Sequence, residues 1–161
     1  MSIILSNVEI STRCETQPER IAMINHQRIF DLTKWLDEVL TRDSVKFDSI
    51  TPSAIPSDGG IYFISDLSQR NEEIIYIGQS SKLSRRVYAN QLQGNKMASQ
   101  IKIALIEHGR AKDLDSAKDY LRKFCAVRFD VLPVYREREM REGFAKAVLK
   151  PQFSLYKSKE H

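Results

Sequence analysis

The sequence has few cysteines and no long hydrophobic run. Its two cysteines, Cys14 and Cys125, form no motif, which excludes a disulfide framework and favours two reduced thiols in a cytoplasmic protein. No stretch of eighteen apolar residues occurs, so we expect neither a membrane span nor a membrane partner. The first eleven residues lack the basic, apolar leader of a secretory signal. Internal repeats and low-complexity segments are also missing. A chain of 161 residues is long enough to form a folded core.

Acidic residues are scarce in the C-terminal half. Residues 79–161 contain 18 Lys and Arg against 9 Asp and Glu, whereas residues 1–78 contain 7 against 12. The overall net charge of +4 therefore conceals a basic C-terminal half. Such asymmetry is typical of a protein that binds a polyanion, and nucleic acid is the first candidate. The alternative is that these side chains only solvate helix surfaces.

Two tripeptides, Gly60-Ile61-Tyr62 and Tyr76-Ile77-Gly78, begin and end the most informative stretch of the chain. Apolar, β-branched and aromatic residues around both of them indicate strands. The residues between the two strands are mostly polar and turn-prone. Two short strands joined by a polar loop predict an antiparallel hairpin.

Apolar spacing and turn residues divide the rest of the chain into elements. The expected order is a strand in 1–11, a helix in 21–40, the hairpin, a helix capped by Ser80 or Ser81, helices in 97–108 and 115–123, a strand in 124–132 and a helix in 136–149. Gly109 is expected to end the 97–108 helix. This order predicts an α+β fold with a small three-stranded antiparallel sheet flanked by helices.

The stretch 49–58 contains two prolines and several small polar residues. It is the predicted boundary between an N-terminal strand and helix extension, residues 1–54, and a second domain, residues 55–161.

The two tripeptides resemble the name-giving motifs of the GIY-YIG nuclease family, and both are unaltered here. The resemblance extends over residues 55–155 and implies the same three-stranded architecture. Either tripeptide alone is common at strand ends, but the ordered set is specific. Its further members are Ile55-Pro56 before the first motif, Arg86 eight residues beyond the Gly of the second, and Glu142 followed by Pro151 and Phe153.

The resemblance implies a phosphodiester-hydrolysing site made of Tyr62, Tyr76, Arg86 and Glu142. Arg86 would hold the scissile phosphate, because its planar and permanently charged group suits phosphate oxygens. Glu142 would bind one Mg²⁺ or Mn²⁺ ion per active site, with waters and phosphate oxygens as the other ligands. Tyr62 would activate or orient the attacking water, and Tyr76 would hydrogen-bond in the same site. A free phenol loses its proton only near about pH 10, so a tyrosine base needs nearby positive charge, to which Lys82 would add.

Each of these residues also has a structural interpretation. Tyr62 and Tyr76 would be ordinary strand aromatics, and Arg86 would be a solvated helix residue. Glu142 would pair with Arg138 at i,i+4 on an exposed helix face. Only their joint spacing favours an active site.

Three positions depart from the family's pattern. Asn90 stands four residues after Arg86, where many members carry a His or Tyr that serves the chemistry. Asn cannot act as an acid or base, so this duty would pass to a tyrosine or to metal-bound water. Ser154 and Lys82 stand where many members carry Asn.

The chain ends soon after the last motif, so we expect DNA recognition by the nuclease-like part itself or by residues 1–54. The compact restriction-like and phage-type members are arranged in this way. Gln and Asn side chains in 91–102 would read adenine edges, and Lys side chains there and around 109–112 would contact phosphate. An ordinary polar loop is the alternative. The residues predicted to contact nucleic acid are Lys82, Arg85, Asn90, Asn95, Lys96 and Lys102.

Two functions from different classes follow. The favoured one is a metal-dependent DNA endonuclease in the cytoplasm of a bacterial or phage-infected cell. The alternative is a nuclease-fold DNA-binding module without turnover that acts as a structural or regulatory partner. One active site cuts one strand, so double-strand cleavage would favour a homodimer or a higher homo-oligomer.

Overall fold

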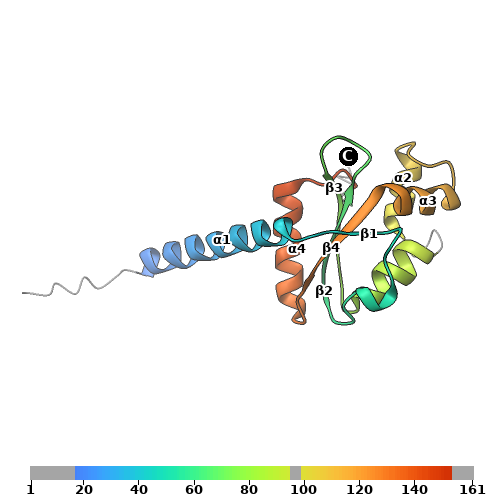
Figure 1. The fold of residues 1–161 in the computed structure, drawn as a ribbon. Helices are drawn as coiled ribbons and strands as arrows, with labels where there is room; N and C mark the ends of the chain where they lie inside the picture. The colour runs from blue at the N-terminus through green and yellow to red at the C-terminus, as the bar shows by residue number, and fades with distance from the viewer. Residues whose placement is uncertain (1–16, 95–98, 154–161) are drawn as a thin grey trace, which may run out of the picture.

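The computed structural model describes residues 17–94 and 99–153, and these form one four-stranded antiparallel sheet with helices on both faces (Figure 1). The strand order is β1-β4-β2-β3. In chain order the elements are α1 (Gln17–Thr41), β1 (Val45–Lys46), the 3₁₀-helix η1 (Pro52–Ala54), β2 (Gly60–Asp66), β3 (Glu73–Ser80), the π-helix η2 (Arg85–Gln93), α2 (Gln100–Glu107), α3 (Leu114–Phe124), β4 (Cys125–Val131) and α4 (Tyr135–Leu149).

The α+β class is confirmed, but the prediction of three strands is wrong. The additional strand is β1, which pairs with β4 through Val45 opposite Val127 and Lys46 opposite Ala126. The amide of Phe47 extends this edge by donating to the carbonyl of Cys125 at 3.1 Å. A strand of two residues is too short to show an alternating pattern, so only its pairing with β4 reveals it.

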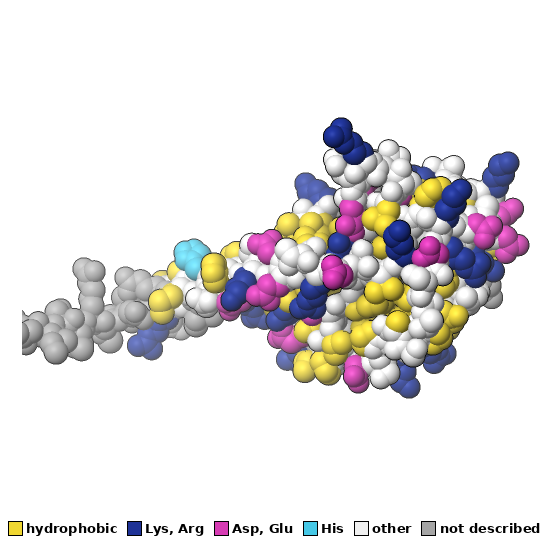
Figure 2. Space-filling view, viewed as in Figure 1, with side chains coloured by type: hydrophobic (Ala, Val, Ile, Leu, Met, Phe, Trp, Pro, Cys, Tyr) yellow, Lys and Arg dark blue, Asp and Glu magenta, His cyan; other side chains and the backbone are white. Residues whose placement is uncertain are grey.

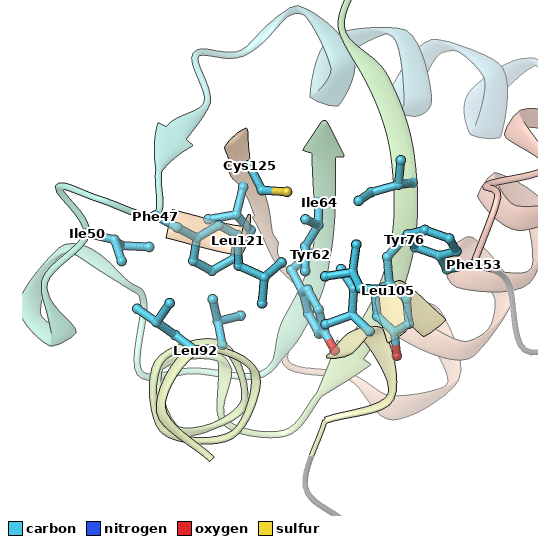
Figure 3. Packing of buried hydrophobic residues seen from close by; sticks show 14 of the residues in the cluster. Phe47, Ile50, Tyr62, Ile64, Tyr76, Leu92, Leu105, Leu121, Cys125 and Phe153 are labelled. Carbon is cyan, nitrogen blue, oxygen red and sulfur yellow. The ribbon is translucent and has the colours of Figure 1, made fainter. Parts of the chain in front are cut away.

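The central strand β2 is buried along its whole length, because the sheet is covered on both faces. Ile61 and Phe63 face α1 and α4, in a cluster completed by Trp35, Leu36, Val39, Ile77 and Ala145. Tyr62 and Ile64 face η2, α2 and α3, in a larger cluster that includes Leu83, Val87, Leu92, Leu105 and Leu121 (Figure 3). The alternation of side chains along β2 therefore places Tyr62 and Ile61, both of the first tripeptide, on opposite faces of the sheet.

The described part of the predicted extension belongs to this same folded unit. Trp35 of α1 donates its indole N–H to Asp130 of β4 at 2.7 Å, and Arg42 pairs with the same carboxylate at 2.6 Å. β1 lies in the sheet itself. The predicted boundary at 49–58 is thus a connection within one sheet and core, and η1 forms part of it.

The other predicted elements agree with the structure where it describes them. The hairpin is β2 and β3, with Tyr62 opposite Gly78, and the helices in 21–40, 115–123 and 136–149 are α1, α3 and α4. The helix predicted in 97–108 is α2, and Gly109 follows its end with φ +70°, as expected for a C-terminal glycine. The predicted strand in 1–11 and residues 95–98 lie outside the described residues.

The helix predicted after the hairpin is η2, a π-helix rather than an α-helix. No helix within the described residues combines the length and apolar character needed to cross a bilayer.

Candidate active site

A polar hollow of about 320 Å³ opens where β3 ends and η2 begins. Three of its seven lining residues are cationic and none is acidic, so the hollow favours an anion. The lining residues are Gln79, Ser80, Ser81, Lys82, Arg85, Arg86 and Asn90.

A tight turn joins β3 to the helix at the floor of this hollow. The hydroxyl of Ser80 accepts from the amide of Lys82 and donates to its carbonyl, both at 3.0 Å. The amides of Leu83 and Ser84 donate to the carbonyls of Asp58 and Pro56 at 3.1 Å. The N-cap residue of η2 is Ser84, without a side-chain cap, so the prediction that Ser80 or Ser81 caps this helix is wrong. Ser80 closes the turn that leads to Arg85 and Arg86.

Arg86 lines the hollow and connects it to Tyr62, which lies in the core and is not itself a lining residue. The Tyr62 side chain is fully buried, and its hydroxyl oxygen accepts a hydrogen bond from Nε of Arg86 at 3.2 Å. Burial disfavours the charge of Arg86, but attraction to Tyr62 and Tyr76 outweighs burial and raises the pKa of the guanidinium. Arg86 therefore stays charged, and its guanidinium lines the hollow, where an anion would meet it.

Tyr76 lies beside Tyr62 but has a different environment. The two rings are stacked, with centroids 6.0 Å apart and planes inclined by 28°. Figure 3 shows both hydroxyls directed toward the same side of the sheet. The Tyr76 hydroxyl donates to Oε1 of Gln100 at 3.3 Å, and burial together with the nearby Tyr62 raises the pKa of Tyr76 well above its usual value. Tyr76 therefore keeps its proton at neutral pH.

The two motif glycines provide the space that this arrangement needs. A Cβ at Gly78 would lie 2.5 Å from the Tyr62 hydroxyl oxygen. A Cβ at Gly60 would overlap the carbonyl of Asp130 and lie 2.6 Å from Leu83 Cδ1. Both tripeptides therefore depend on glycine for close packing around Tyr62.

Glu142 is placed by α4 and pairs with a cation of its own helix. Its Oε1 accepts from Nζ of Lys146 at 2.7 Å, and both side chains are largely buried. The predicted alternative partner, Arg138, instead donates to the carbonyls of Leu132 and Pro133 and to Oε1 of Gln79. The structure thus brings Tyr62, Tyr76 and Arg86 together, and within its described residues it shows no hydrogen bond or ion pair between Glu142 and these three.

The edge strand β3 separates Glu142's helix from the tyrosines. Ala145 of α4 belongs to the cluster on the face opposite the tyrosines. After α4 the chain crosses this edge, because Phe153 donates its amide to the carbonyl of Ile75 at 2.9 Å and packs in the tyrosine cluster. A contact between Glu142 and an anion in the hollow would therefore pass around the β3 edge.

The predicted nucleic-acid contacts have different environments. Lys82, Arg85 and Asn90 line the hollow, whereas Asn95 and Lys96 lie outside the described residues. Lys102 is fully buried and donates its ammonium to the carbonyl of Gly94. Burial, aided by the nearby Lys118 and Arg122, lowers the pKa of Lys102 to about 8. This environment does not agree with a direct contact between Lys102 and DNA.

Two residues at the site were not predicted as partners of the motif side chains. Gln91 donates its Nε2 to the Tyr62 oxygen at 2.9 Å, although the sequence suggested that it would read bases from the surface. Gln79 lines the hollow and accepts from Nε of Arg138 at 3.3 Å, which connects α4 to the hollow. The sequence places Gln79 directly after Gly78 and Gln91 directly after Asn90, and this was the one sign that they lie near the site. No local sequence pattern shows which atom a Gln side chain will contact.

The donor set for a metal ion is small. Within residues 17–94 and 99–153, no group of three or more His, Cys, Asp or Glu side chains is placed to hold an ion. The structure shows one hydrogen bond to the Glu142 carboxylate in this part of the chain, and that bond goes to Oε1. A single carboxylate oxygen fits Mg²⁺, which keeps several waters and is often bound by one or two carboxylates and substrate phosphates.

Known proteins give no further guide to this site. No family model, no curated protein and no solved structure matches the chain. The side chains at the hollow and the two tripeptides are therefore the features that bear on the function.

Proposed function

We propose that this protein is a metal-dependent DNA endonuclease of the GIY-YIG type, which hydrolyses phosphodiester bonds. The observation that carries the proposal is the 3.2 Å hydrogen bond to the buried Tyr62 oxygen from Arg86, which lines a hollow with two further cations. A phosphate in this hollow would meet a fixed positive charge beside a buried phenol. Those are two of the groups that phosphodiester hydrolysis needs.

The chain's own residues supply three functions in this reaction. Arg86 would hold a phosphate oxygen through its terminal nitrogens, while Lys82 and Arg85 would contact the adjoining backbone. Tyr62, in its deprotonated form, would take one proton from a water whose oxygen forms the new bond to phosphorus. The bond from phosphorus to the leaving sugar oxygen then breaks, and that oxygen takes a proton from solvent. Tyr76, which keeps its proton, would support the Tyr62 ring by stacking.

Glu142 would hold one Mg²⁺ or Mn²⁺ ion through the carboxylate oxygen that does not accept from Lys146. When bound, the ion would neutralise charge on the phosphate. Lys146 would orient this carboxylate and would also compete with the ion for it, because both are cations.

A second candidate is a nuclease-fold module that binds DNA without cutting it. The ion pair between Glu142 and Lys146 favours this candidate, because it satisfies the carboxylate without any metal. Asn90 favours it too, because it lines the hollow and cannot exchange a proton. This module would bind DNA in a salt-dependent manner and leave it intact with every divalent metal.

Cleavage of supercoiled plasmid with Mg²⁺ or Mn²⁺ tests the proposal. We expect the wild type to cut, and Arg86→Ala, Tyr62→Phe and Glu142→Gln each to lower the rate by about 10²–10³-fold, since each removes a group that acts on the phosphate, the water or the metal. Arg20→Ala, on the exposed start of α1, is the control and should cut normally.

Two outcomes would contradict the proposal. If Arg86→Ala and Glu142→Gln both cut at the wild-type rate, the assignment of these residues to the active site is wrong. A wild type that binds plasmid but leaves it intact with both metals would favour the binding module instead.

A further inference from the structure

We infer that Gln91 is a positioning residue for Tyr62, brought to it by the π-helical turn of η2. Gln91 is fully buried, and its Nε2 donates to the Tyr62 oxygen at 2.9 Å. The Tyr62 oxygen thus accepts two hydrogen bonds, one from Gln91 and one from Arg86. The inference rests on the proposed function for its effect on cleavage, but the contact itself can be tested without it.

The geometry of η2 explains why Gln91 reaches Tyr62. Arg86 and Gln91 are five residues apart in a helix that runs as a π-helix from Arg85 to Gln93. Its hydrogen bonds join residues five apart, so side chains at that spacing lie on one face. In an α-helix the neighbours of Arg86 on one face would be three or four residues away, and the residue four away is Asn90. Here Asn90 lines the hollow, while Gln91 points inward.

The same helix shows its period in the core. Leu83, Val87 and Leu92 are all buried in the cluster around Tyr62, at spacings of four and then five residues. A five-residue step at this point keeps Leu92 on the inner face of a π-helix. The wide turn is therefore fixed by packing as well as by the polar contact. Such turns occur frequently at functional sites.

A second buried residue fixes the orientation of the Gln91 amide. The hydroxyl of Ser99, also fully buried, donates to Oε1 of Gln91 at 2.7 Å. Because its oxygen accepts from Ser99, the amide must present its NH₂ group to Tyr62. The resulting order of donation is Ser99 to Gln91 to Tyr62.

The two donors to Tyr62 have a shared chemical consequence. Neither the Nε–H of Arg86 nor the NH₂ of Gln91 can accept a proton, and both stabilise negative charge on the oxygen they contact. Gln91 would therefore hold the Tyr62 oxygen in place without competing for the proton of the attacking water. Tyr76 shows the opposite arrangement, because its hydroxyl donates to Gln100.

Near-isosteric changes at Gln91 separate this role from packing. Gln91→Met keeps the volume but has no donor, and Gln91→Glu keeps the shape but turns the donor into an acceptor. We expect Gln91→Met to lower the single-turnover cleavage rate by about tenfold or more and Gln91→Glu to lower it further, with DNA affinity without metal unchanged within about twofold. Gln27→Met and Gln27→Glu, at an exposed glutamine of α1, are the matched controls and should cut normally.

A second measurement reads the contact directly. The ¹³Cζ signal of Tyr62, assigned by its loss in Tyr62→Phe, should shift in Gln91→Met and stay in place in Gln27→Met. If the wild type fails to cut DNA, the proposed function fails, and this signal alone decides the contact. An unshifted signal, or cleavage by Gln91→Met at the wild-type rate, would overturn the inference.

Ser99→Ala covers the case in which the Gln91 variants do not fold. It removes only the hydroxyl that orients the amide, so we expect a smaller loss of cleavage rate, about threefold to tenfold, with unchanged DNA affinity. Cleavage by Ser99→Ala at the wild-type rate would overturn the inference in that case.

Discussion

At the scale of single residues, the two motif tyrosines differ in the direction of their hydrogen bonds. The oxygen of Tyr62 accepts from Arg86 and Gln91, whereas the hydroxyl of Tyr76 donates to Gln100. Environments that treat two like groups differently commonly mark different roles in catalysis. In the proposed reaction, this contrast would give proton transfer to Tyr62 and a neutral, supporting role to Tyr76.

Lys102 is the residue whose burial has the clearest pH consequence. Its pKa is about 8 in the folded protein against 10.5 for a free lysine, because burial and then the charges of Lys118 and Arg122 disfavour its ammonium. Between these two pH values the unfolded chain binds more protons than the folded one. The free energy of unfolding contributed by Lys102 therefore rises with pH across this window.

We predict that Lys102→Met is most stable relative to the wild type below about pH 8, and that this relative stability declines as pH rises toward 10.5. The reason is that the wild type loses the Lys102 proton when it folds in this pH window, so its folded state gains stability as pH rises. Methionine has no proton to lose, so the variant gains none. Urea unfolding at pH 7, 8, 9 and 10 measures the difference, with Lys34→Met on the exposed face of α1 as the control. A difference that stays constant from pH 7 to 10 would contradict the burial of Lys102.

At the scale of elements, α1 consists of two parts with different surroundings. Its C-terminal part packs Trp35, Leu36 and Val39 against the sheet and α4. Its N-terminal part extends away from the sheet, with Ile29 and Phe30 exposed (Figures 1 and 2). Arg28 in the N-terminal part still donates to the Met140 sulfur of α4. The larger share of the stability that α1 contributes should therefore come from its buried C-terminal part.

Leu36→Ala and Phe30→Ala test this division within one helix. Leu36 is 4% exposed and Phe30 is 64% exposed. We expect Leu36→Ala to lower the free energy of unfolding by about 2–4 kcal/mol, because it leaves a cavity beside Ile61 and Phe63. Phe30→Ala should change it by less than about 0.5 kcal/mol. Equal effects in denaturant titrations would show that α1 is not divided in this way.

At the scale of the whole molecule, the charge at the hollow differs from the charge on the face shown in Figure 2. On the face shown in Figure 2, Lys and Arg side chains alternate with Asp and Glu. The hollow, in contrast, has Lys82, Arg85 and Arg86 and no acid among its lining residues. DNA would therefore be bound by a few phosphate contacts near the hollow.

A few phosphate contacts imply a small but measurable dependence on salt. We predict that Arg85→Ala weakens DNA binding and reduces the slope of log K against log salt concentration by about 1, because one phosphate contact is lost. Titrations of a DNA duplex between 50 and 200 mM salt, roughly the range in which such contacts are resolved, measure this slope. Arg20→Ala, on α1, should leave the slope unchanged. The same slope in both variants would place the DNA elsewhere on the molecule.

Local pattern was sufficient to predict most elements of this fold. The hairpin around Tyr62 and Tyr76, the amphipathic helix that is now α1, and the strand β4 all have a periodicity that neighbouring residues create by themselves. The resemblance of the two tripeptides also selected Arg86, which the structure brings to the Tyr62 oxygen. These features depend on residues close in sequence or on a recurring motif.

Tertiary structure alone decided the partners of the key side chains. The chain's pattern indicated a helix after Ser80, but in the folded protein this helix is a π-helix, with Leu92 packed in the core and Gln91 at the Tyr62 oxygen. The pattern allowed Glu142 to pair with Arg138, but the carbonyls of Leu132 and Pro133 hold Arg138, and Lys146 pairs with Glu142 instead. Periodicity determines which face of an element is buried, whereas the atom that a polar side chain contacts depends on distant residues that meet only after the sheet and helices pack.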